Sequence, residues 1–388
     1  MPHTVNKPRL LVISEGNAES WDSWSGTSKS VVNGLRHRGH HVITGDSDIY
    51  GLLRPLIGGT QYSMNRKRWW VKYHLGRLPF FMRSRNAAAL VQRYASECDA
   101  ILQFGATFNP GFTSGLPLFL YCDGNIALSS HARPSGQSEA SHLRESEIES
   151  VRTREYDLYR RASHIFTISE RLRQSFVEDF SIPLNNVTTV YAGANIPTLD
   201  SDMVYNGEYP WPPTVLFVGR QFERKGGDVL LRAFQAVKTS IPDARLLLLG
   251  PEGLEISQEG VVQLGLIDKD APDGTRRIAD VYRQSHVFCM PTRYEGLSIS
   301  FLEAMSFGLP CVSTYTEWSQ PEMILDGETG LVIPMDDDEA LAAALVELLS
   351  HPQKAKDMGE RGRARASSIF TWDRVTALMS EEITRKCR

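Results

Sequence analysis

The chain has 388 residues, enough for two domains that each bury a core of their own. Hydrophobic residues make up 41% and charged residues 23%, as in ordinary globular proteins, and the net charge of −4 argues against a nucleic-acid-binding protein. Five scattered cysteines argue against a disulfide framework, and the polar N-terminus and short apolar runs predict neither a signal peptide nor a membrane span. We therefore expect a cytoplasmic protein.

The first half of the chain alternates short apolar runs with helix-like segments. The run Leu10–Ser14, the helical spacing of Ser28–Arg38 and the run Val42–Thr44 predict a βαβ unit with parallel strands. Further strands are predicted at Ala100–Phe104, Leu118–Cys122, His164–Ile168 and Thr188–Tyr191. We take residues 1–195 as one Rossmann-like domain.

Residues 196–213 interrupt this alternation. They include Asn206-Gly207 and Pro210-Trp-Pro-Pro213 and have no periodicity, which predicts a linker. Residues 214–370 then form a second Rossmann-like domain, and residues 371–388 a C-terminal helix that can return to the first. Its predicted elements are Thr214–Gly219, Asp228–Ser240, Arg245–Gly250, Gly260–Gly265, Thr275–Gln284, Val287–Met290, Ser298–Phe307 and Cys311–Thr314. The expected fold is α/β, with two domains facing each other across a cleft and the ligand at the carboxyl ends of the strands.

The strongest local signal is Glu295-Gly-Leu-Ser-Ile-Ser-Phe-Leu-Glu303-Ala-Met-Ser-Phe-Gly308-Leu-Pro310. Gly308 and Pro310 end a helix that starts near Ser298, so Glu295 lies in the loop ahead of it. The amides at the helix start are then free to bind an anion. Glu303 has apolar neighbours, and its carboxylate needs a hydrogen-bonding partner, for which a ribose diol would serve. The alternative is a loop charge at Glu295 and a solvated helix position at Glu303.

A second signal is Val218-Gly219-Arg220-Gln-Phe-Glu-Arg224-Lys225-Gly226-Gly227, which directly follows a predicted strand. Arg220 and Lys225 lie on a glycine-flanked loop that leads into a helix, and two such cations can close around a diphosphate. The segment is neither a Walker loop nor the GxGxxG fingerprint. Alone it is a weak signal, because loops of this kind often carry Arg and Lys for solubility.

In their order these motifs resemble the retaining glycosyltransferases of family 4, also called group 1 glycosyltransferases, which have the GT-B fold. The resemblance is specific in residues 214–334 and looser elsewhere. It is carried by Val218-Gly-Arg…Lys225-Gly, Leu249-Gly-Pro-Glu-Gly, Tyr282…Pro291, Glu295…Glu303-Ala-Met…Gly308-Leu-Pro-Cys-Val, Asp326-Gly-Glu-Thr-Gly-Leu-Val and Phe370-Thr-Trp-Asp.

The resemblance implies a role for each matching residue. Arg220 and Lys225 match the positions that neutralise the leaving pyrophosphate of the donor. Glu295 matches a contact to the donor sugar, and Glu303 a contact to the ribose. Base contacts are expected to be mostly main-chain, around Leu264–Ile267 and Arg293. The expected donor-binding residues are Gly26, Arg220, Lys225, Arg293, Glu295, Gly296, Leu297, Ser298, Ile299 and Glu303.

The end of the strand Leu118–Cys122 departs from the family pattern. Relatives often have a His-Asp pair there, whereas this chain has Cys122-Asp123-Gly124. Asp123 is the remaining polar candidate near the anomeric carbon, where it would bind a sugar hydroxyl or accept the acceptor's proton. The equal alternative is a turn aspartate ahead of a glycine. We place Asp123 with Glu295, Arg220 and Lys225 among the candidate catalytic residues.

No metal or other cofactor is expected, because cations and amides can stabilise the leaving group and the sugar nucleotide is itself a co-substrate. The run Asp336-Asp337-Asp338 invites a metal interpretation. It precedes the helical segment Ala340–Leu349, however, and is more simply an acidic helix start.

A basic stretch stands out in the first domain. Residues 49–96 contain nine Arg or Lys and no Asp or Glu, and the densest part, residues 65–85, is interleaved with aromatic residues. Such a segment suits peripheral contact with the inner face of a membrane that carries a lipid-linked acceptor, or a pocket for an anionic soluble acceptor. A solvated face with partly buried aromatics is the plainer alternative.

The function implied by the resemblance is retaining transfer of a hexose from a nucleoside diphosphate sugar, with UDP-glucose favoured. The acceptor would be a glycan or a lipid-linked acceptor bound by the N-terminal domain in polysaccharide biosynthesis. Two alternatives stay open: a sugar-nucleotide epimerase of GT-B fold, and a degenerate protein that binds the sugar nucleotide without turnover.

Overall fold

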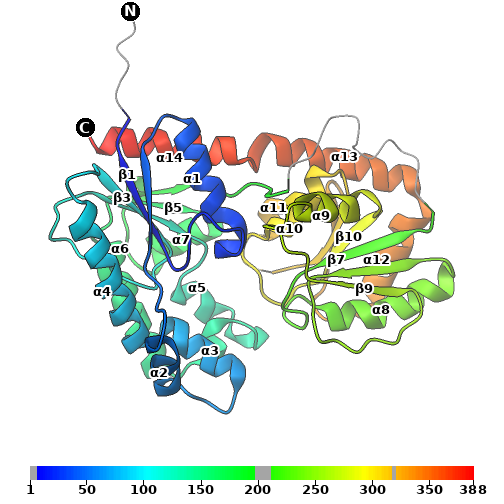
Figure 1. The fold of residues 1–388 in the computed structure, drawn as a ribbon. Coiled ribbons are helices and arrows are strands. Elements are labelled where there is room, and N and C mark those ends of the chain that lie inside the picture. The colour runs from blue at the N-terminus through cyan, green and yellow to red at the C-terminus, as the bar shows by residue number, and fades with distance from the viewer. Residues whose placement is uncertain (1–6, 197–210, 317–319) are drawn as a thin grey trace, which may run out of the picture. The chain divides into compact units, whose positions relative to one another are not determined.

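The computed structural model describes residues 7–196, 211–316 and 320–388, which fall into two compact units (Figure 1). The N-terminal unit comprises residues 1–191 together with 372–388, and the C-terminal unit comprises residues 192–371. Most of the predicted linker 196–213 lies outside the described residues. Each unit is an α/β domain built around one six-stranded parallel sheet, as the sequence predicts.

The sheet of the N-terminal unit has the strand order β2-β1-β3-β4-β5-β6. The central strands are buried along their whole length, which explains why they read as continuous apolar runs. Their positions agree with the predicted strands to within two residues. The strands are β1 (Leu10–Ser14), β2 (Val42–Asp46), β3 (Ala100–Phe104), β4 (Leu118–Cys122), β5 (His164–Thr167) and β6 (Val187–Thr189).

Seven α-helices and four short 3-10 helices connect these strands within the described residues. Gly76 has an extended backbone and separates two of the helices, whereas Pro79 sits in the first turn of the second, where proline is tolerated. The elements are η1 (Ser23–Gly26), α1 (Thr27–His37), α2 (Leu53–Thr60), α3 (Arg66–Leu75), α4 (Arg77–Tyr94), α5 (Ile126–His131), η2 (Arg133–Ser135), η3 (Glu139–His142), α6 (Glu145–Tyr159), α7 (Glu170–Glu178) and η4 (Leu184–Asn186).

The last helix of the chain, α14 (Trp372–Lys386), packs on α1 and so completes the N-terminal unit. The buried imidazole of His40 bridges the Ser380 hydroxyl and the Pro8 carbonyl, at 2.8 Å each. A Cβ on Gly34 would lie 2.6 Å from the Thr376 methyl group, so the glycine allows the two helices to approach closely.

The sheet of the C-terminal unit has the order β12-β11-β10-β7-β8-β9, with every described pair parallel. Its strands are β7 (Thr214–Val218), β8 (Arg245–Leu249), β9 (Val261–Gly265), β10 (Val287–Met290), β11 (Cys311–Thr314) and β12 (Gly330–Ile333). Its helices are α8 (Gly227–Ser240), α9 (Gly274–Arg283), α10 (Ile299–Ser306), α11 (Gln320–Met323), α12 (Asp338–Ser350) and α13 (Pro352–Ile369). The sequence analysis misses β12.

Strand order reverses next to the first strand of each unit. In the C-terminal unit β8 lies on one side of β7 and β10 on the other, and in the N-terminal unit β2 and β3 flank β1 in the same way. At such a switch point, loops leave two adjacent strands in opposite directions and open a crevice at their carboxyl ends. The fold therefore places loops 219–226 and 291–298 at the expected ligand position. Among the described helices, none is long and apolar enough to cross a membrane.

Candidate functional site

Two glycines allow the loop after β7 to take its shape. A Cβ on Gly219 would lie 2.2 Å from Lys225 Cδ, so the missing side chain makes room for the lysine stem. Gly226 has φ +74°, and a Cβ there would lie 1.9 Å from the Pro291 carbonyl oxygen. Only glycine permits this approach of the loop after β7 to the loop after β10. Arg220 is exposed, one residue beyond Gly219.

Lys225 and Glu295 form an ion pair between these two loops. Lys225 Nζ lies 2.8 Å from Glu295 Oε2, and the two side chains are 13% and 15% exposed. Arg224 approaches the same carboxylate at 3.4 Å. Burial opposes ionisation of Glu295, but Arg224 and Lys225 outweigh it and hold its pKa below the ordinary value. Burial also lowers the pKa of Lys225, against the attraction of Glu295.

Helix α10 starts a few residues after Glu295 and Gly296. Ile299 is its first residue, Ser298 occupies the N-cap position, and both Leu297 and Ser298 are buried. The first amides of a helix have no intrahelical acceptor and carry the positive end of its dipole. The first amides of α10 thus follow Glu295 closely in the chain, and anion binding at residues 296–299 stays a prediction.

Glu303 lies in α10, 3% exposed, and the chain itself supplies its partners. Lys269 Nζ donates to one carboxylate oxygen at 3.1 Å, and the Tyr282 hydroxyl donates to the other at 2.8 Å. The alternative of a solvated helix position is thus wrong, while a contact to ribose stays a prediction. Lys269 was missed because it reads as a loop charge between Asp268 and Asp270. The signal was available: a buried carboxylate needs a cation, and Lys269 follows a strand of the same sheet.

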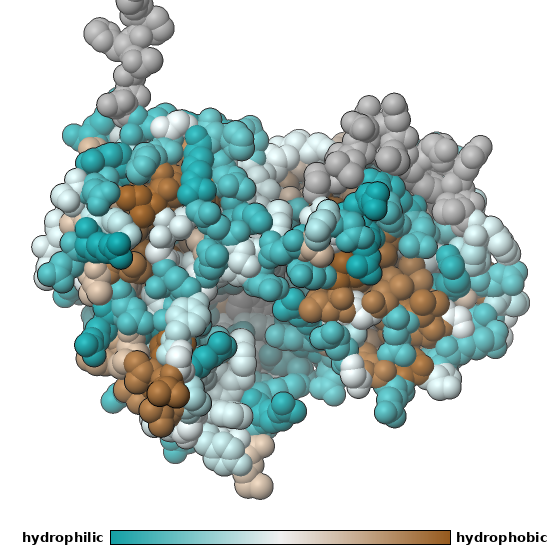
Figure 2. Space-filling view, in the orientation of Figure 1, coloured by the Kyte–Doolittle hydropathy of each residue, from teal (hydrophilic) through white to brown (hydrophobic). Residues whose placement is uncertain are grey.

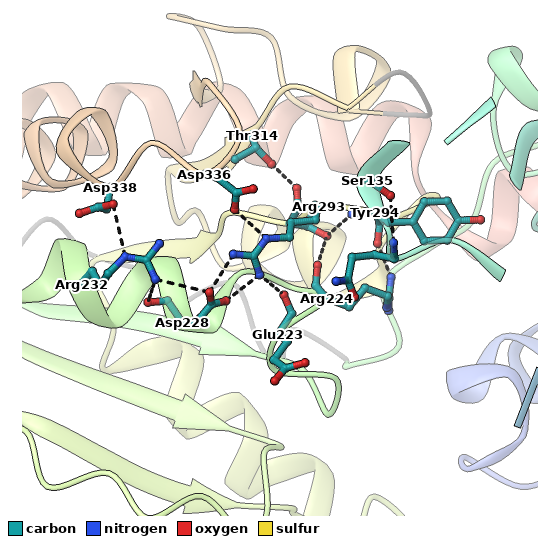
Figure 3. A network of polar contacts seen from close by, with 12 residues as sticks. Ser135, Glu223, Arg224, Asp228, Arg232, Arg293, Tyr294, Thr314, Asp336 and Asp338 are labelled. Atoms are coloured by element: carbon teal, nitrogen blue, oxygen red, sulfur yellow. Dashed lines mark hydrogen bonds and ion pairs between the residues drawn. The ribbon is translucent and has the colours of Figure 1, made fainter. Parts of the chain in front are cut away.

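Arg293 is the centre of a polar network (Figure 3). Its guanidinium donates to both carboxylate oxygens of Asp228 at 2.7 and 2.8 Å, to Asp336 at 2.6 Å, and to the Glu223 carbonyl oxygen at 2.6 Å. These carboxylates raise the pKa of Arg293. The network links the loop after β10 to the start of α8, and so helps to keep Lys225 close to Glu295. Sequence reasoning missed this positioning role, and the predicted base contact of Arg293 stays a prediction.

The same loops are joined by three further hydrogen bonds at Arg224. The amide of Arg293 donates to the Arg224 carbonyl oxygen at 3.0 Å, and the Thr292 hydroxyl donates to it at 3.3 Å. The Arg224 guanidinium donates in turn to the Tyr294 carbonyl oxygen. Arg224, which the sequence analysis does not single out, therefore contacts both the backbone and the carboxylate of the facing loop.

The acidic run at residues 336–338 divides its carboxylates among three partners. Asp336 binds Arg293, Asp337 caps α12 by accepting the Ala340 amide at 2.8 Å, and Asp338 lies 3.4 Å from Arg232. The acidic helix start is confirmed. Within the residues that the structure describes, His, Cys, Asp and Glu side chains form no group of three that could hold a metal ion.

Gly26 and Asp123 belong to the N-terminal unit. Gly26 has φ +86° and precedes the first residue of α1. Trp24 and Ser25 ahead of it are also left-handed, with φ of 51° and 54°. Trp24 and Ser25 are strained in this conformation, whereas Gly26 is not, and such strain is found chiefly at functional loops. Asp123 is exposed at the carboxyl end of β4. Its proposed contact with the donor stays a prediction.

Comparison with known proteins finds a family match in the C-terminal unit. The model of the family described as "Glycosyl transferases group 1" matches residues 212–351. The GDP-mannose-dependent alpha-(1-6)-phosphatidylinositol monomannoside mannosyltransferase of Mycolicibacterium smegmatis is 32% identical over 182 residues, which cover 44% of this chain and 47% of that protein. The chain thus spans about half the length of this curated relative.

Solved structures with the same fold cover nearly the whole chain. Sucrose-phosphate synthase from Thermosynechococcus elongatus matches with a TM-score of 0.71 and 18% identity, over 96% of this chain and 98% of its own. The Anabaena protein HepE, solved in complex with UDP-glucose, matches with a TM-score of 0.64 and 15% identity over the same shares. These findings show that residues 212–351 are similar to the group 1 glycosyltransferases, and that the chain shares the GT-B fold of the solved structures.

Proposed function

We propose that the chain is a retaining hexosyltransferase that cleaves a nucleoside diphosphate sugar. The observation that carries this proposal is the Lys225–Glu295 pair, largely buried at the switch point of the C-terminal sheet and next to the start of α10. A cation, a carboxylate and free backbone amides at one point suit a substrate with a hydroxyl-rich sugar and a diphosphate. They also stabilise the charge that develops on the departing diphosphate.

Donor binding then requires an exchange of partners within the site. A diphosphate that contacts Lys225 and Arg220 competes with Glu295 for the lysine ammonium group. As Lys225 turns to the phosphate, an oxygen of Glu295 becomes available to accept a sugar hydroxyl. The amides of residues 296–299 bind the remaining phosphate or sugar oxygens, and Glu303, held by Lys269, accepts a ribose hydroxyl. Two residues of the N-terminal unit complete the proposal, Gly26 for the donor phosphate and Asp123 for a sugar hydroxyl or the acceptor's proton.

UDP-glucose is the first donor to test, because the similar Anabaena protein was solved with it. GDP-mannose is the second, since the relative from M. smegmatis is named for its dependence on that nucleotide. The same name includes a phosphatidylinositol monomannoside, which favours a glycan or lipid-linked acceptor for this chain, in polysaccharide biosynthesis.

The proposal is tested by release of nucleoside diphosphate from each donor. We expect release from one donor, with kcat lowered about 10²- to 10³-fold by Lys225→Ala or by Glu295→Gln, the usual effect of losing one transition-state contact. Lys238→Ala is a matched control, because this lysine lies on α8 and pairs with Glu259. Conversion of one sugar nucleotide into another without diphosphate release would instead indicate an epimerase. Donor binding with no turnover in the presence of acceptors would indicate a degenerate binding protein.

A further inference from the structure

The outward face of α2 is apolar, which is unusual for a surface helix of a globular protein. Leu52 is 84% exposed, Leu53 50% and Leu56 66%. Ile57, one turn after Leu53, is buried at 5% and anchors the helix. A helix that packs only against its own domain would carry polar residues at these outward positions. The leucines therefore leave an exposed apolar area on the described part of the N-terminal unit.

Large apolar side chains continue from α2 into α3. Tyr62 is 65% exposed, Met64 92% and Trp70 52%. The two helices are joined, because Trp69 Nε1 donates to the Gly58 carbonyl oxygen at 2.7 Å. We call this surface the α2–α3 surface; it comprises Leu52, Leu53, Leu56, Tyr62, Met64 and Trp70. Figure 2 shows hydrophobic residues gathered over α2.

Cations flank the apolar residues of this surface. Arg54, Arg66 and Lys67 are exposed, and the sequence has no acidic residue between positions 49 and 96. Other cations of the predicted segment 65–85 are used within the unit. Arg68 binds Glu147 at 2.8 Å, and the fully buried Arg83 binds Glu15 at 2.8 Å. The region that can contact an anionic partner thus begins earlier in the chain than the segment 65–85.

We propose that the α2–α3 surface docks on an anionic lipid bilayer, with its leucines and Met64 in the acyl boundary and its cations at the headgroups. Apolar residues beside cations match the layered chemistry of a bilayer surface, where both kinds of contact add to the binding free energy. The surface lies in the N-terminal unit and contains none of the donor residues, so the inference goes beyond the proposed function. It places the enzyme where a lipid-linked acceptor would be presented.

Vesicle flotation of the full chain tests this docking. We expect binding to phosphatidylcholine vesicles that contain phosphatidylglycerol, weaker binding to phosphatidylcholine alone, and a decrease with added salt. The triple variant Leu52→Ser/Leu53→Ser/Leu56→Ser should lower the partition coefficient at least about tenfold, since it removes the inserted side chains. Arg54→Glu/Arg66→Glu should lower it about tenfold on anionic vesicles only.

Two matched controls test whether exposed leucines and cations elsewhere in the N-terminal unit also contribute to vesicle binding. Leu184→Ser changes a leucine of the same unit that is 58% exposed on η4, and Arg160→Glu/Arg161→Glu reverses two exposed cations just beyond the C-terminal end of α6. Both should bind vesicles like the parent chain. All variants should keep the parent melting temperature and release diphosphate from soluble donor at the parent rate, which separates this test from that of the donor site.

Three outcomes would overturn the proposal. The parent chain does not float with anionic vesicles, or the triple variant floats as well as the parent. The third is a dimer of the parent chain in sedimentation experiments that the leucine substitutions convert to a monomer, because the occupant of the surface would then be a second copy of the chain.

Discussion

The two units differ in the partners that they provide for buried carboxyl groups. In the C-terminal unit, both candidate site carboxylates have a cation at hand, Lys225 for Glu295 and Lys269 for Glu303. In the N-terminal unit, Glu15 follows β1 and binds Arg83 and His74, whereas Glu155 of α6 accepts the Ile126 amide at 3.0 Å. Burial raises the pKa of Glu155 to about 8, against that amide and the nearby Arg154. Of the three carboxylates paired with cations, Glu15 follows the first strand of its sheet. Glu295 lies in a switch-point loop, and Glu303 lies in the helix that follows this loop. Glu155, in contrast, lies on a helix of the N-terminal unit and accepts a backbone amide, and the pKa of its carboxyl is raised.

Removing Arg83, the cation paired with Glu15, should give the largest loss of stability. Arg83→Met leaves the carboxylate of Glu15 and that of Asp48 without the guanidinium between them, and should destabilise the protein by about 3–5 kcal/mol. Urea unfolding measures the loss, with Arg85→Met as the control, because Arg85 is exposed two residues along the same helix. A loss below about 1 kcal/mol would contradict the importance of this pair.

The buried carboxyl of Glu155 should make stability fall as pH rises. Its pKa in the folded state, about 8, lies above that of the unfolded chain, so the folded state retains a proton that the unfolded state has lost. Between pH 5.5 and 8 this group should remove about 3 kcal/mol of stability. Glu155→Gln keeps an oxygen for the Ile126 amide and should flatten the pH dependence of the urea midpoint. An equally steep slope in the variant would show that Glu155 is ionised in the folded protein.

Weakening the Arg293 network should misplace Glu295 without removing any group from the site. Arg293→Lys loses the bidentate contact to Asp228, and kcat for donor cleavage should fall about tenfold with little change in KM. Arg232→Lys is the matched control, since Arg232 contacts the same aspartate at 3.5 Å from an exposed position. If Arg293→Lys instead changes the preference between UDP and GDP donors, Arg293 is the base contact that the sequence analysis expects.

The smallest expected change in stability comes from the strained backbone at Ser25 and not from a charged side chain. Ser25 is left-handed with φ 54°, and Ser25→Gly should relieve that strain and stabilise the protein by about 0.5–1 kcal/mol. Ser30→Gly, inside the regular helix α1, should destabilise it by about as much, because glycine loses more conformational freedom there. Melting temperatures that move in the same direction for both variants would contradict a strained loop at residues 24–26.

The strands and the position of α10 were predictable because buried parallel strands and helix ends leave local signals: apolar runs such as Leu246–Leu249, and the stop at Gly308. Contacts between residues far apart in the sequence leave no such local signal. Lys269 reaches Glu303 from a loop of another strand, and Arg293 reaches Asp228 through the approach that Gly226 permits. The left-handed Trp24 was equally hidden, because tertiary packing holds it there: a Cβ on Gly105 would lie 2.9 Å from its ring. The sequence thus indicated where the candidate site residues lie in the fold, but not the partners that hold them, and the roles of these residues stay predictions.

The return of α14 to the N-terminal unit bears on how the chain folds as it leaves the ribosome. The first helix α1 packs against the last helix, through Arg38 and Asp373 at 2.6 Å and through His40 and Ser380. The N-terminal unit is therefore complete only when α14 has been synthesised. The C-terminal unit, in contrast, contains its whole sheet between residues 214 and 333. Residues 192–371 are therefore translated between the two parts of the N-terminal unit. A chain cut before residue 372 should leave the surface of α1 that α14 covers exposed to solvent.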